Sequence, residues 1–545
     1  MNHGIRKHKF VDIVQRKIYP AQIEFEAGKI VRIVEINADC EGYILPGFID
    51  AHIHIESSML VPTEFARLAV RFGTVGTISD PHEIANVCGL DGVKYMLENA
   101  AKTPFKFHFG APSCVPATVF ETAGAILGPL EVETLLARPD IYYLSEVMNY
   151  PGVLHGDPDM LAKIAMAKKY AKPVDGHAPG LRGEAAKRYI DAGIQTDHEC
   201  FTKEEALDKL KAGMKILIRE GSAAKNFEAL IDLLPEYYEQ MMFCCDDKHP
   251  DELIVSHMDE HVRRAVARGL DLFQVLQVAC INPVNHYNMR CGLLRPGDPA
   301  DFIVVEDLTD FKVTETVLDG IPVYANDEVF LPRGTAQPVN VFYPVHLEKN
   351  ALAFPVAEAS SRIRCIEVLD GQLITRTVEM EAKIEGGYVV SDPVRDILKV
   401  VVVNRYKQAP PAVAFIRNFG LREGAIASTV AHDSHNIIAV GADDHTLEQA
   451  IQNLITSRGG LSVVSSTKNL TMPLPVAGLM SLSSGDEVAA HYTELHLAAK
   501  ALGCPLRSPF MSLSFMALLV IPQLKLSDLG LFDGNEFKFT DVIVK

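Results

Sequence analysis

Two histidines, His52 and His54, follow a short apolar stretch and are separated by a single residue. They lie in the segment LPGFIDAHIHIESS (Leu45 to Ser58). Residues two apart in a β-strand point to the same side, so a strand here would place two imidazoles side by side. Neutral imidazole is the commonest nitrogen ligand of transition metals. One buried histidine is usually a core residue, but two on one strand face after a Pro-Gly break favour a metal site.

The elements that would position this pair alternate eight times between strand-like and helix-like patterns. Helical stretches such as PTEFARLAVR have apolar residues every three or four positions. Pro62 and Pro158 suit first helical turns, and Thr202 suits an N-cap. Eight such units in about 240 residues match the size of a (β/α)8 barrel. The predicted strands are Ile44–His54, Val75–Asp80, Lys106–Ser113, Ile141–Met148, Pro173–Ala178, Ile194–Glu199, Met214–Arg219 and Met241–Asp247.

Further candidate ligands stand at the ends of these strands. The chemistry of such a barrel sits at the C-terminal ends of its strands. Glu146 ends the fourth predicted strand, His177 the fifth, His198 the sixth and Asp246 the eighth. A random scatter of histidines and acids would not show this placement, so the pattern predicts one site built from several strand ends.

The flanks of the barrel predict two further domains. Short alternating segments over residues 11–43 return over residues 292–324, which indicates one small β-sandwich split in sequence. Beyond residue 344, two buried strand patterns and two helical patterns indicate an α+β domain. The predicted domains are residues 1–45 with 291–345, the barrel over 46–290, and the C-terminal domain over 346–545.

Composition excludes several classes of protein. The chain has 545 residues, a formal net charge of −18 and no basic run, so nucleic acid and anionic membranes are not expected partners. No signal peptide is evident, and the apolar runs are too short to span a bilayer. The ten cysteines contain no C-x-x-C pair, which argues against a disulfide framework or a structural zinc site and favours the cytoplasm.

Several motifs carry a resemblance to a known family. PGFID-x-H-x-H resembles the first-strand signature of the amidohydrolase superfamily, which are metal-dependent hydrolases on a (β/α)8 barrel. The segments SDPHEIANV, LSEVMNYPGV, DGHAPG, TDHE and FCCDDKHP narrow the resemblance to the bacterial-type adenine deaminases. It runs through nearly the whole chain, and DPHEIANV together with AHDSHN (Ala431 to Asn436) is its most specific part.

The resemblance implies a site with two divalent ions. In that arrangement His52, His54 and Asp246 hold one ion, and His177 and His198 hold the other. Glu146 bridges them, where many amidohydrolases carry a carboxylated lysine. These ligands suit Mn²⁺, Fe²⁺ or Zn²⁺ alike.

The implied reaction is the hydrolytic deamination of adenine to hypoxanthine and ammonia, with hydroxide attacking C6. Asp246 would take the proton of the hydroxide and pass it to the leaving nitrogen. The purine ring also needs a proton, and Glu146, His82 and Glu83 all remain candidates for this acid. The residues expected to contact substrate are His82, Glu83, Ser113 and Asp247. The family also suggests a homo-oligomer, a dimer or larger.

Some residues keep two interpretations at this stage. Asp247 either contacts substrate or caps the following helix, and Ser113 either lines the pocket or forms a turn. Glu146 has an ordinary salt bridge as its alternative role, and Arg219 with Glu220 suggests an internal ion pair. The residues His432, Asp433 and His435 fit a lid contact, an extra metal site or a hydrogen-bonded surface loop.

Two other functions compete with deamination. Hydrolysis of a cyclic amide or imide is the alternative within the superfamily, but those enzymes usually use the carboxylated lysine. A non-catalytic metal-binding or assembly module is disfavoured by six intact ligand positions. The H-x-E match at His54 to Glu56 lacks the P-C-x-x-C that cytidine-type deaminases need, and no phosphate-binding glycine loop is present.

Overall fold

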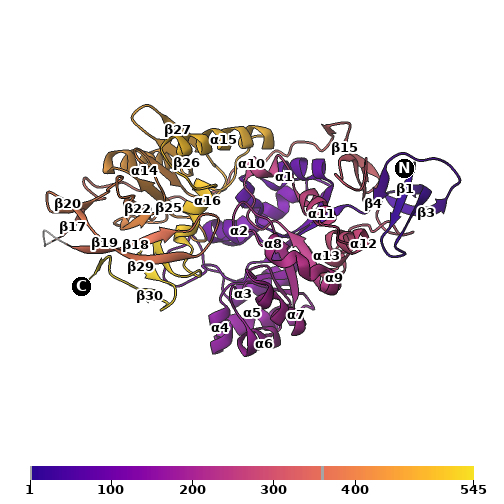
Figure 1. Ribbon diagram of the computed structural model, residues 1–545, viewed down its shortest axis with the longest axis horizontal. Coiled ribbons are helices and arrows are strands. Elements are labelled where there is room, and N and C mark those ends of the chain that lie inside the picture. The colour runs from indigo at the N-terminus through magenta and orange to yellow at the C-terminus, as the bar shows by residue number, and fades with distance from the viewer. Residues whose placement is uncertain (1–2, 357–360, 545) are drawn as a thin grey trace.

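The computed structural model describes residues 3–356 and 361–544. Figure 1 shows the barrel helices in the middle, the first strands of the chain at one end and the C-terminal elements at the other. Within the described residues, no helix is both long enough and apolar enough to cross a membrane. The arrangement confirms the predicted fold class, a (β/α)8 barrel with additional sheets.

Eight parallel strands form the barrel, in a five-stranded and a three-stranded sheet. The two sheets meet at both edges. At one edge the Gln195 amide donates to the Val174 carbonyl, and at the other the Asp246 amide donates to the His52 carbonyl at 2.8 Å. The strands are β5 (Phe48–Ile53), β6 (Thr74–Ser79), β7 (Lys106–Ala111), β8 (Ile141–Val147), β9 (Val174–Gly176), β10 (Thr196–Asp197), β11 (Lys215–Arg219) and β12 (Met241–Cys244).

The first predicted strand is two strands in two different sheets. β4 (Tyr43–Leu45) pairs with β1 (His3–Asp12), whereas β5 begins the barrel. Pro46 and Gly47 separate them, because proline donates no ladder hydrogen bond and the chain must bend there. A Cβ on Gly47 would lie 2.2 Å from Cγ1 of Val75, so only glycine allows this close approach to β6.

The barrel helices begin where the sequence predicts. Pro62 opens α1 (Pro62–Ala69) and Pro158 opens α5 (Pro158–Lys169). The Thr202 hydroxyl caps α7 (Lys203–Lys211) by accepting the Glu205 amide at 3.2 Å. The remaining helices around the barrel include α2 (His82–Ala100), α3 (Pro129–Leu136), α4 (Tyr150–His155), α6 (Gly183–Ala192), α10 (Pro250–Leu253) and α11 (Met258–Ala267).

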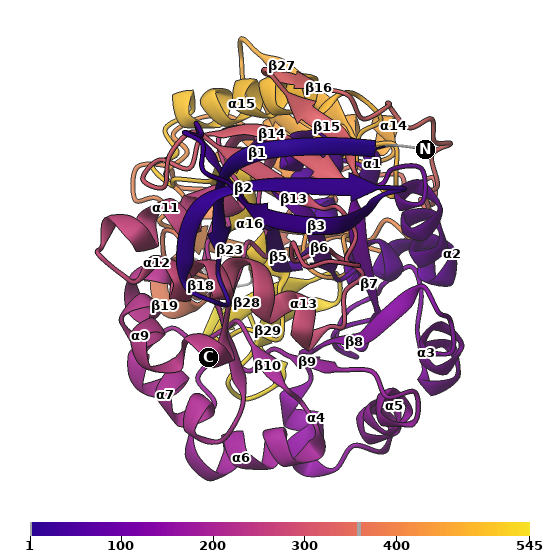
Figure 2. The same cartoon turned by 90° about the vertical axis from the view of Figure 1, so that its right-hand side faces the viewer.

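An eight-stranded sheet gathers strands from both sides of the barrel segment. Its order is β16-β15-β14-β13-β4-β1-β2-β3, and β13 (Phe302–Val305) pairs with β4. Figure 2 shows β1, β2 (Lys17–Glu26) and β3 (Lys29–Glu35) in front of the barrel strands. The other members are β14 (Val313–Leu318), β15 (Ile321–Ala325) and β16 (Glu328–Val329). This pairing supports our proposed division into residues 1–45 with 291–345, 46–290 and 346–545.

The C-terminal domain contains a nine-stranded sheet whose central strands are buried. β24 (Ala425–Ser428) and β25 (Ile437–Gly441) are antiparallel neighbours, so the segment 429–436 between them protrudes from the end of a hairpin. α14 (Asp444–Ser457) and α15 (Gly485–Ala501) match the two predicted helices. The Asn436 side chain donates to the Thr122 carbonyl of the barrel at 2.8 Å, which ties the protruding segment to the barrel mouth.

Candidate metal centre and substrate pocket

Three ligand-type atoms converge where β5 and β12 end. The Nε2 atoms of His52 and His54 lie 3.2 Å apart, and Oδ1 of Asp246 lies 3.7 and 3.0 Å from them, respectively. Ligands about 2.1 Å from one metal ion lie roughly 3.0–3.4 Å from each other at ordinary bond angles. All three side chains are buried, and the spacing therefore fits one cation.

A second set forms at the ends of β8, β9 and β10. Oε2 of Glu146 lies 2.7 Å from Nδ1 of His177 and 3.3 Å from Nε2 of His198. The 3.3 Å separation lies in the range expected for ligands of one cation, whereas the 2.7 Å contact is a hydrogen-bond distance that would have to lengthen around an ion. Nδ1 of His177 faces the carboxylate, and its buried Nε2 has no hydrogen-bond partner among the described residues.

Glu146 faces both sets at once. Its Oε1 atom lies 3.3 Å from Nε2 of His54, while Oε2 faces His177 and His198. Burial alone would raise the pKa of this carboxyl, but the imidazole of His177 holds the pKa well below its usual range. An ionised carboxylate with one oxygen toward each set has the geometry of a bridge.

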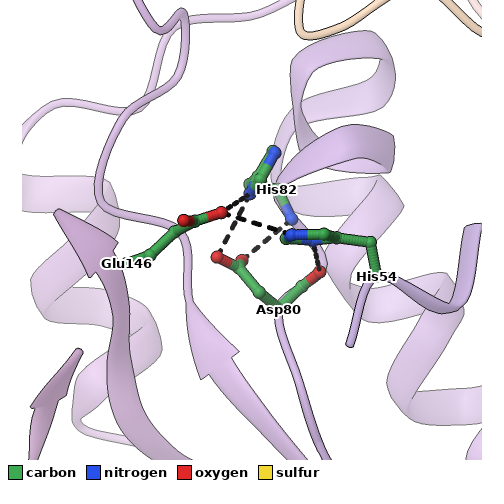
Figure 3. Close-up of side chains that lie close together, drawn as sticks. All are labelled: His54, Asp80, His82 and Glu146. Atoms are coloured by element: carbon green, nitrogen blue, oxygen red, sulfur yellow. Dashed lines mark hydrogen bonds and ion pairs between the residues drawn. The ribbon is translucent and has the colours of Figure 1, made fainter. Parts of the chain in front are cut away.

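Asp80 and His82 form the support of the first set, as Figure 3 shows together with His54 and Glu146. Nδ1 of His54 donates to the Asp80 carbonyl at 3.2 Å, which leaves Nε2 free to bind a cation. Nδ1 of His82 lies 3.1 Å from Oδ2 of Asp80 and 3.5 Å from Oε1 of Glu146. Asp80 was not among the predicted site residues, although it directly follows β6 and belongs to the DPHEIANV motif.

Arg219 and Glu199 also line the site, and neither was among the predicted site residues. The Arg219 guanidinium contacts both Glu199 and Asp246. Burial would raise the pKa of Asp246, but Arg219 lowers it well below the usual range. The expected Arg219–Glu220 ion pair is wrong: Glu220 pairs with Arg264 of α11, because successive residues leave a strand on opposite sides.

Asp247 belongs to the pocket and does not cap a helix. The N-cap of α10 is His249, so the capping interpretation is wrong. Oδ1 of Asp247 lies 2.5 Å from the Ser57 hydroxyl, and that hydroxyl lies 3.0 Å from Oε1 of Glu83. Burial raises the pKa of Asp247 to about 6.

The cavity over the metal ligands has a volume of about 30 Å³. Its barrel lining contains all the predicted ligands except His52, and also His82 and Asp247. Glu83 and Ser113 do not line it. The Ser113 hydroxyl instead donates to the Glu146 carbonyl at 2.5 Å and so fixes the end of β8. The C-terminal domain contributes five lining residues, Leu373, His432, Asp433, Phe515 and Leu518.

The histidines of the segment 429–436 are not on the surface. His432, Asp433 and His435 are all buried, so the surface-loop interpretation is wrong. Nδ1 of His432 lies 3.2 Å from Oε1 of Glu83, and the three residues Glu83, His432 and His435 form a compact group. However, Nδ1 of His435 accepts the Ala431 amide, so the neutral ring carries its proton on Nε2 and has no lone pair left for a metal. We therefore propose the lid contact as the role of this segment.

Comparison with known proteins agrees with this geometry. The amidohydrolase family matches residues 43–323, and the adenine deaminase C-terminal domain matches residues 372–538. Proteins named adenine deaminase from Sulfurovum sp. (strain NBC37-1), Salinibacter ruber and Methanosarcina acetivorans are 56%, 53% and 52% identical to this chain. Each match covers 98% of this chain and 98–99% of the relative. The amidohydrolase family implies a divalent metal, for which the convergent ligand atoms provide a fit. On this similarity, the chain belongs to the adenine deaminase family of amidohydrolases.

Proposed function

We propose that this protein is an enzyme that hydrolyses adenine to hypoxanthine and ammonia. The observation that carries the proposal is the convergence of six ligand side chains at barrel strand ends, in a chain about half identical to proteins named adenine deaminase. The bridging position is a glutamate, Glu146, rather than the lysine that cyclic-amide hydrolases usually carboxylate. That difference favours deamination over hydrolysis of a cyclic amide or imide.

The proposed cofactor is a pair of divalent ions. His52, His54 and Asp246 would hold one, and His177 and His198 the other, with Glu146 between them. The donor set of imidazoles and carboxylates suits Mn²⁺ or Fe²⁺, and also Zn²⁺. Such ions lower the pKa of water from about 15.7 to about 7, and so supply hydroxide for attack at C6 at neutral pH.

Asp246 is the proposed proton carrier. Arg219 keeps its carboxylate ionised and fixes one oxygen, Oδ2, while the other oxygen, Oδ1, faces the histidine pair. An ionised carboxylate in this position accepts the proton of the attacking hydroxide and passes it to the departing amine. C6 then bears the new oxygen, ammonia leaves and hypoxanthine remains.

His82 is the proposed acid for the ring nitrogen. It lines the cavity, whereas Glu83 does not, and both oxygens of Glu146 face the ligand histidines. Burial would lower the pKa of His82, but the Asp80 carboxylate raises it well above the usual range. A protonated imidazole at the cavity wall can donate to a purine nitrogen as C6 becomes tetrahedral.

The reaction is tested by loading the purified chain with Mn²⁺ and following adenine by ultraviolet absorbance, with ammonia measured in parallel. Adenine should be consumed with equimolar hypoxanthine and ammonia, and dihydroorotate should not react. Turnover of dihydroorotate without turnover of adenine would favour the cyclic-amide alternative.

We also propose a cytoplasmic location and self-association. All ten cysteines are free thiols, and nine of them are buried, which suits a reducing compartment. Assembly into a dimer or larger oligomer is implied by the resemblance, and sedimentation of the full chain tests it.

A further inference from the structure

Two polar atoms on the C-terminal wall of the cavity lack a partner within the described residues. They are Nε2 of His432 and Oδ2 of Asp433, and each side chain is 3% exposed. A buried polar atom without a hydrogen bond is costly, so its persistence needs an explanation. Because both residues line the same cavity as the metal ligands, a bound molecule is the natural partner.

Their position relative to the metal ligands is defined by His82. Nδ1 of His82 lies 3.5 Å from Oε1 of Glu146, and its Nε2 lies 3.7 Å from Oδ1 of Asp433. One imidazole ring therefore separates the bridging carboxylate from Asp433. A flat heterocycle held with one edge at the metal ligands would bring its opposite edge toward the C-terminal wall.

His432 is held as a hydrogen-bond donor. Its Nδ1 faces Oε1 of Glu83, and its ring stacks against Phe515 with centroids 5.2 Å apart. Burial would lower the pKa of His432, but the carboxylates of Asp247 and Glu83 raise it to about 9. At neutral pH both ring nitrogens thus carry protons. Among the described residues Nε2–H has no hydrogen-bond acceptor, and the nearest carboxylate oxygen, Oδ1 of Asp247, lies 3.9 Å away.

Asp433 is the complementary acceptor. Burial would raise its pKa, but His82 and His432 keep the pKa below its usual range, so the carboxylate is ionised. The wall therefore presents one charged donor beside one charged acceptor. In adenine, the edge opposite C6 presents N3, an acceptor, beside N9–H, a donor.

We propose that His432 and Asp433 bind the N3/N9 edge of the purine and thereby select the free base over N9-substituted purines. Nε2–H of His432 donates to N3, and N9–H donates to Oδ2 of Asp433. A nucleoside has no proton on N9, and its sugar would meet the apolar wall of Phe515 and Leu518. This inference rests on the proposed deamination, because it places C6 at the metal ligands.

The size of the cavity adds a requirement. The cavity of about 30 Å³ is small for a purine. The proposal therefore includes an outward shift of the C-terminal wall when the base enters, and the two unpaired atoms are polar groups that the base meets there.

The test compares substrates that differ at one ring atom, using the full chain loaded with Mn²⁺. Wild-type kcat/KM for adenine should exceed that for 9-methyladenine by about 10- to 100-fold or more, since a hydrogen bond to a charged group is lost. In Asp433→Ala, kcat/KM for adenine should fall and the preference for adenine should shrink toward one. In Asp433→Asn, which keeps an uncharged carbonyl acceptor, the preference should shrink less. In His432→Phe, which retains a ring against Phe515, the preference for adenine over 3-deazaadenine should shrink in the same way.

The exposed Glu423 of the same domain provides a matched control, and Glu423→Gln should leave both preferences unchanged. A merely structural role for Asp433 would lower activity on adenine and 9-methyladenine equally, and an unchanged preference in folded Asp433→Ala would overturn the proposal. If the wild type does not deaminate adenine at all, the proposed function itself fails. If it does so without discriminating against 9-methyladenine, only the present inference fails.

Discussion

The two halves of the cavity differ in how their carboxylates are paired. On the barrel side, Glu146 and Asp246 lie 2.7–3.7 Å from the nearest ligand nitrogens, so the carboxylates and imidazoles face one another. On the C-terminal side, His432 and Asp433 each carry an atom with no partner among the described residues. We propose that the barrel half holds cations, whereas the C-terminal half offers groups without a hydrogen-bond partner to a further ligand.

On this basis we propose that the barrel side of the cavity carries out the reaction and that the C-terminal side recognises the substrate. The barrel ligands stand at the ends of adjacent parallel strands, whose positions the sheet fixes. The C-terminal residues stand on a hairpin loop and a short helical turn, η6 (Phe515–Ala517), which can move more easily than a barrel strand. Substitutions in the first group should act on metal content and turnover, and those in the second mainly on substrate binding.

Removal of the metal should have the largest effect. Dialysis against a chelator should reduce adenine turnover below detection, because the hydroxide nucleophile depends on bound cations. Addition of Mn²⁺ or Fe²⁺ should restore it. Full turnover by protein shown to be metal-free by elemental analysis would break the assignment of the barrel half to cation binding.

The substitution Asp246→Asn should have the second largest effect. Turnover should fall by about 10²–10⁴-fold or more, because the amide cannot accept the proton and binds metal poorly. Asp247→Asn is the neighbouring control and should retain more turnover at saturating adenine, with a raised KM. Steady-state kinetics of both variants measure this difference. If Asp247→Asn abolishes turnover while Asp246→Asn does not, the roles of the two carboxylates are reversed.

The sequence predicted the barrel half well and the C-terminal half poorly, for a physical reason. Each barrel ligand follows a strand whose period and length are legible, so its place at the barrel mouth follows from the fold. Arg219 also ends a strand, but its partners Glu199 and Asp246 come from the neighbouring strands and could not be identified from its own neighbourhood. Placing Phe515 beside His432 requires the packing of two domains, which local patterns do not encode. The AHDSHN motif gave the one signal for that half.

Phe515→Ala should have a smaller effect than the carboxylate substitutions. The phenyl ring packs against His432 and lines the cavity, so its loss should raise KM for adenine about tenfold and change kcat less. Kinetics with metal content measured in parallel provide the check. A loss of bound metal in this variant would contradict the separation between the two halves.

Replacement of Lys525 should have the smallest effect, and it should change the free energy of unfolding rather than turnover. Its buried Nζ donates to the carbonyls of two cavity-lining residues, Leu373 at 2.6 Å and Phe515 at 2.9 Å. Burial lowers the pKa of Lys525 from its usual 10.5 to about 7. Between these pH values the unfolded chain binds more protons than the folded chain, so this group makes stability rise with pH, by at most about 1.4 kcal/mol per unit.

The measurement is urea unfolding of wild type and Lys525→Met at several pH values from 6 to 9. The stability of the wild type relative to the variant should be constant below about pH 7 and should increase above it. A difference that stays constant from pH 6 to 9 would mean that Lys525 is held as a cation, and that its contacts with the cavity wall are of another kind.

The most direct test of the central claim measures bound metal and adenine turnover in the same preparations of wild type and Glu146→Gln. The wild type should bind two ions per chain and deaminate adenine. The Glu146→Gln variant should fold but lose metal, turnover or both, because a neutral amide cannot bridge two cations as a carboxylate does. The melting temperature of the variant shows that it is folded. Wild-type metal content together with wild-type turnover in Glu146→Gln would contradict the account, and Glu146 would then be a structural residue.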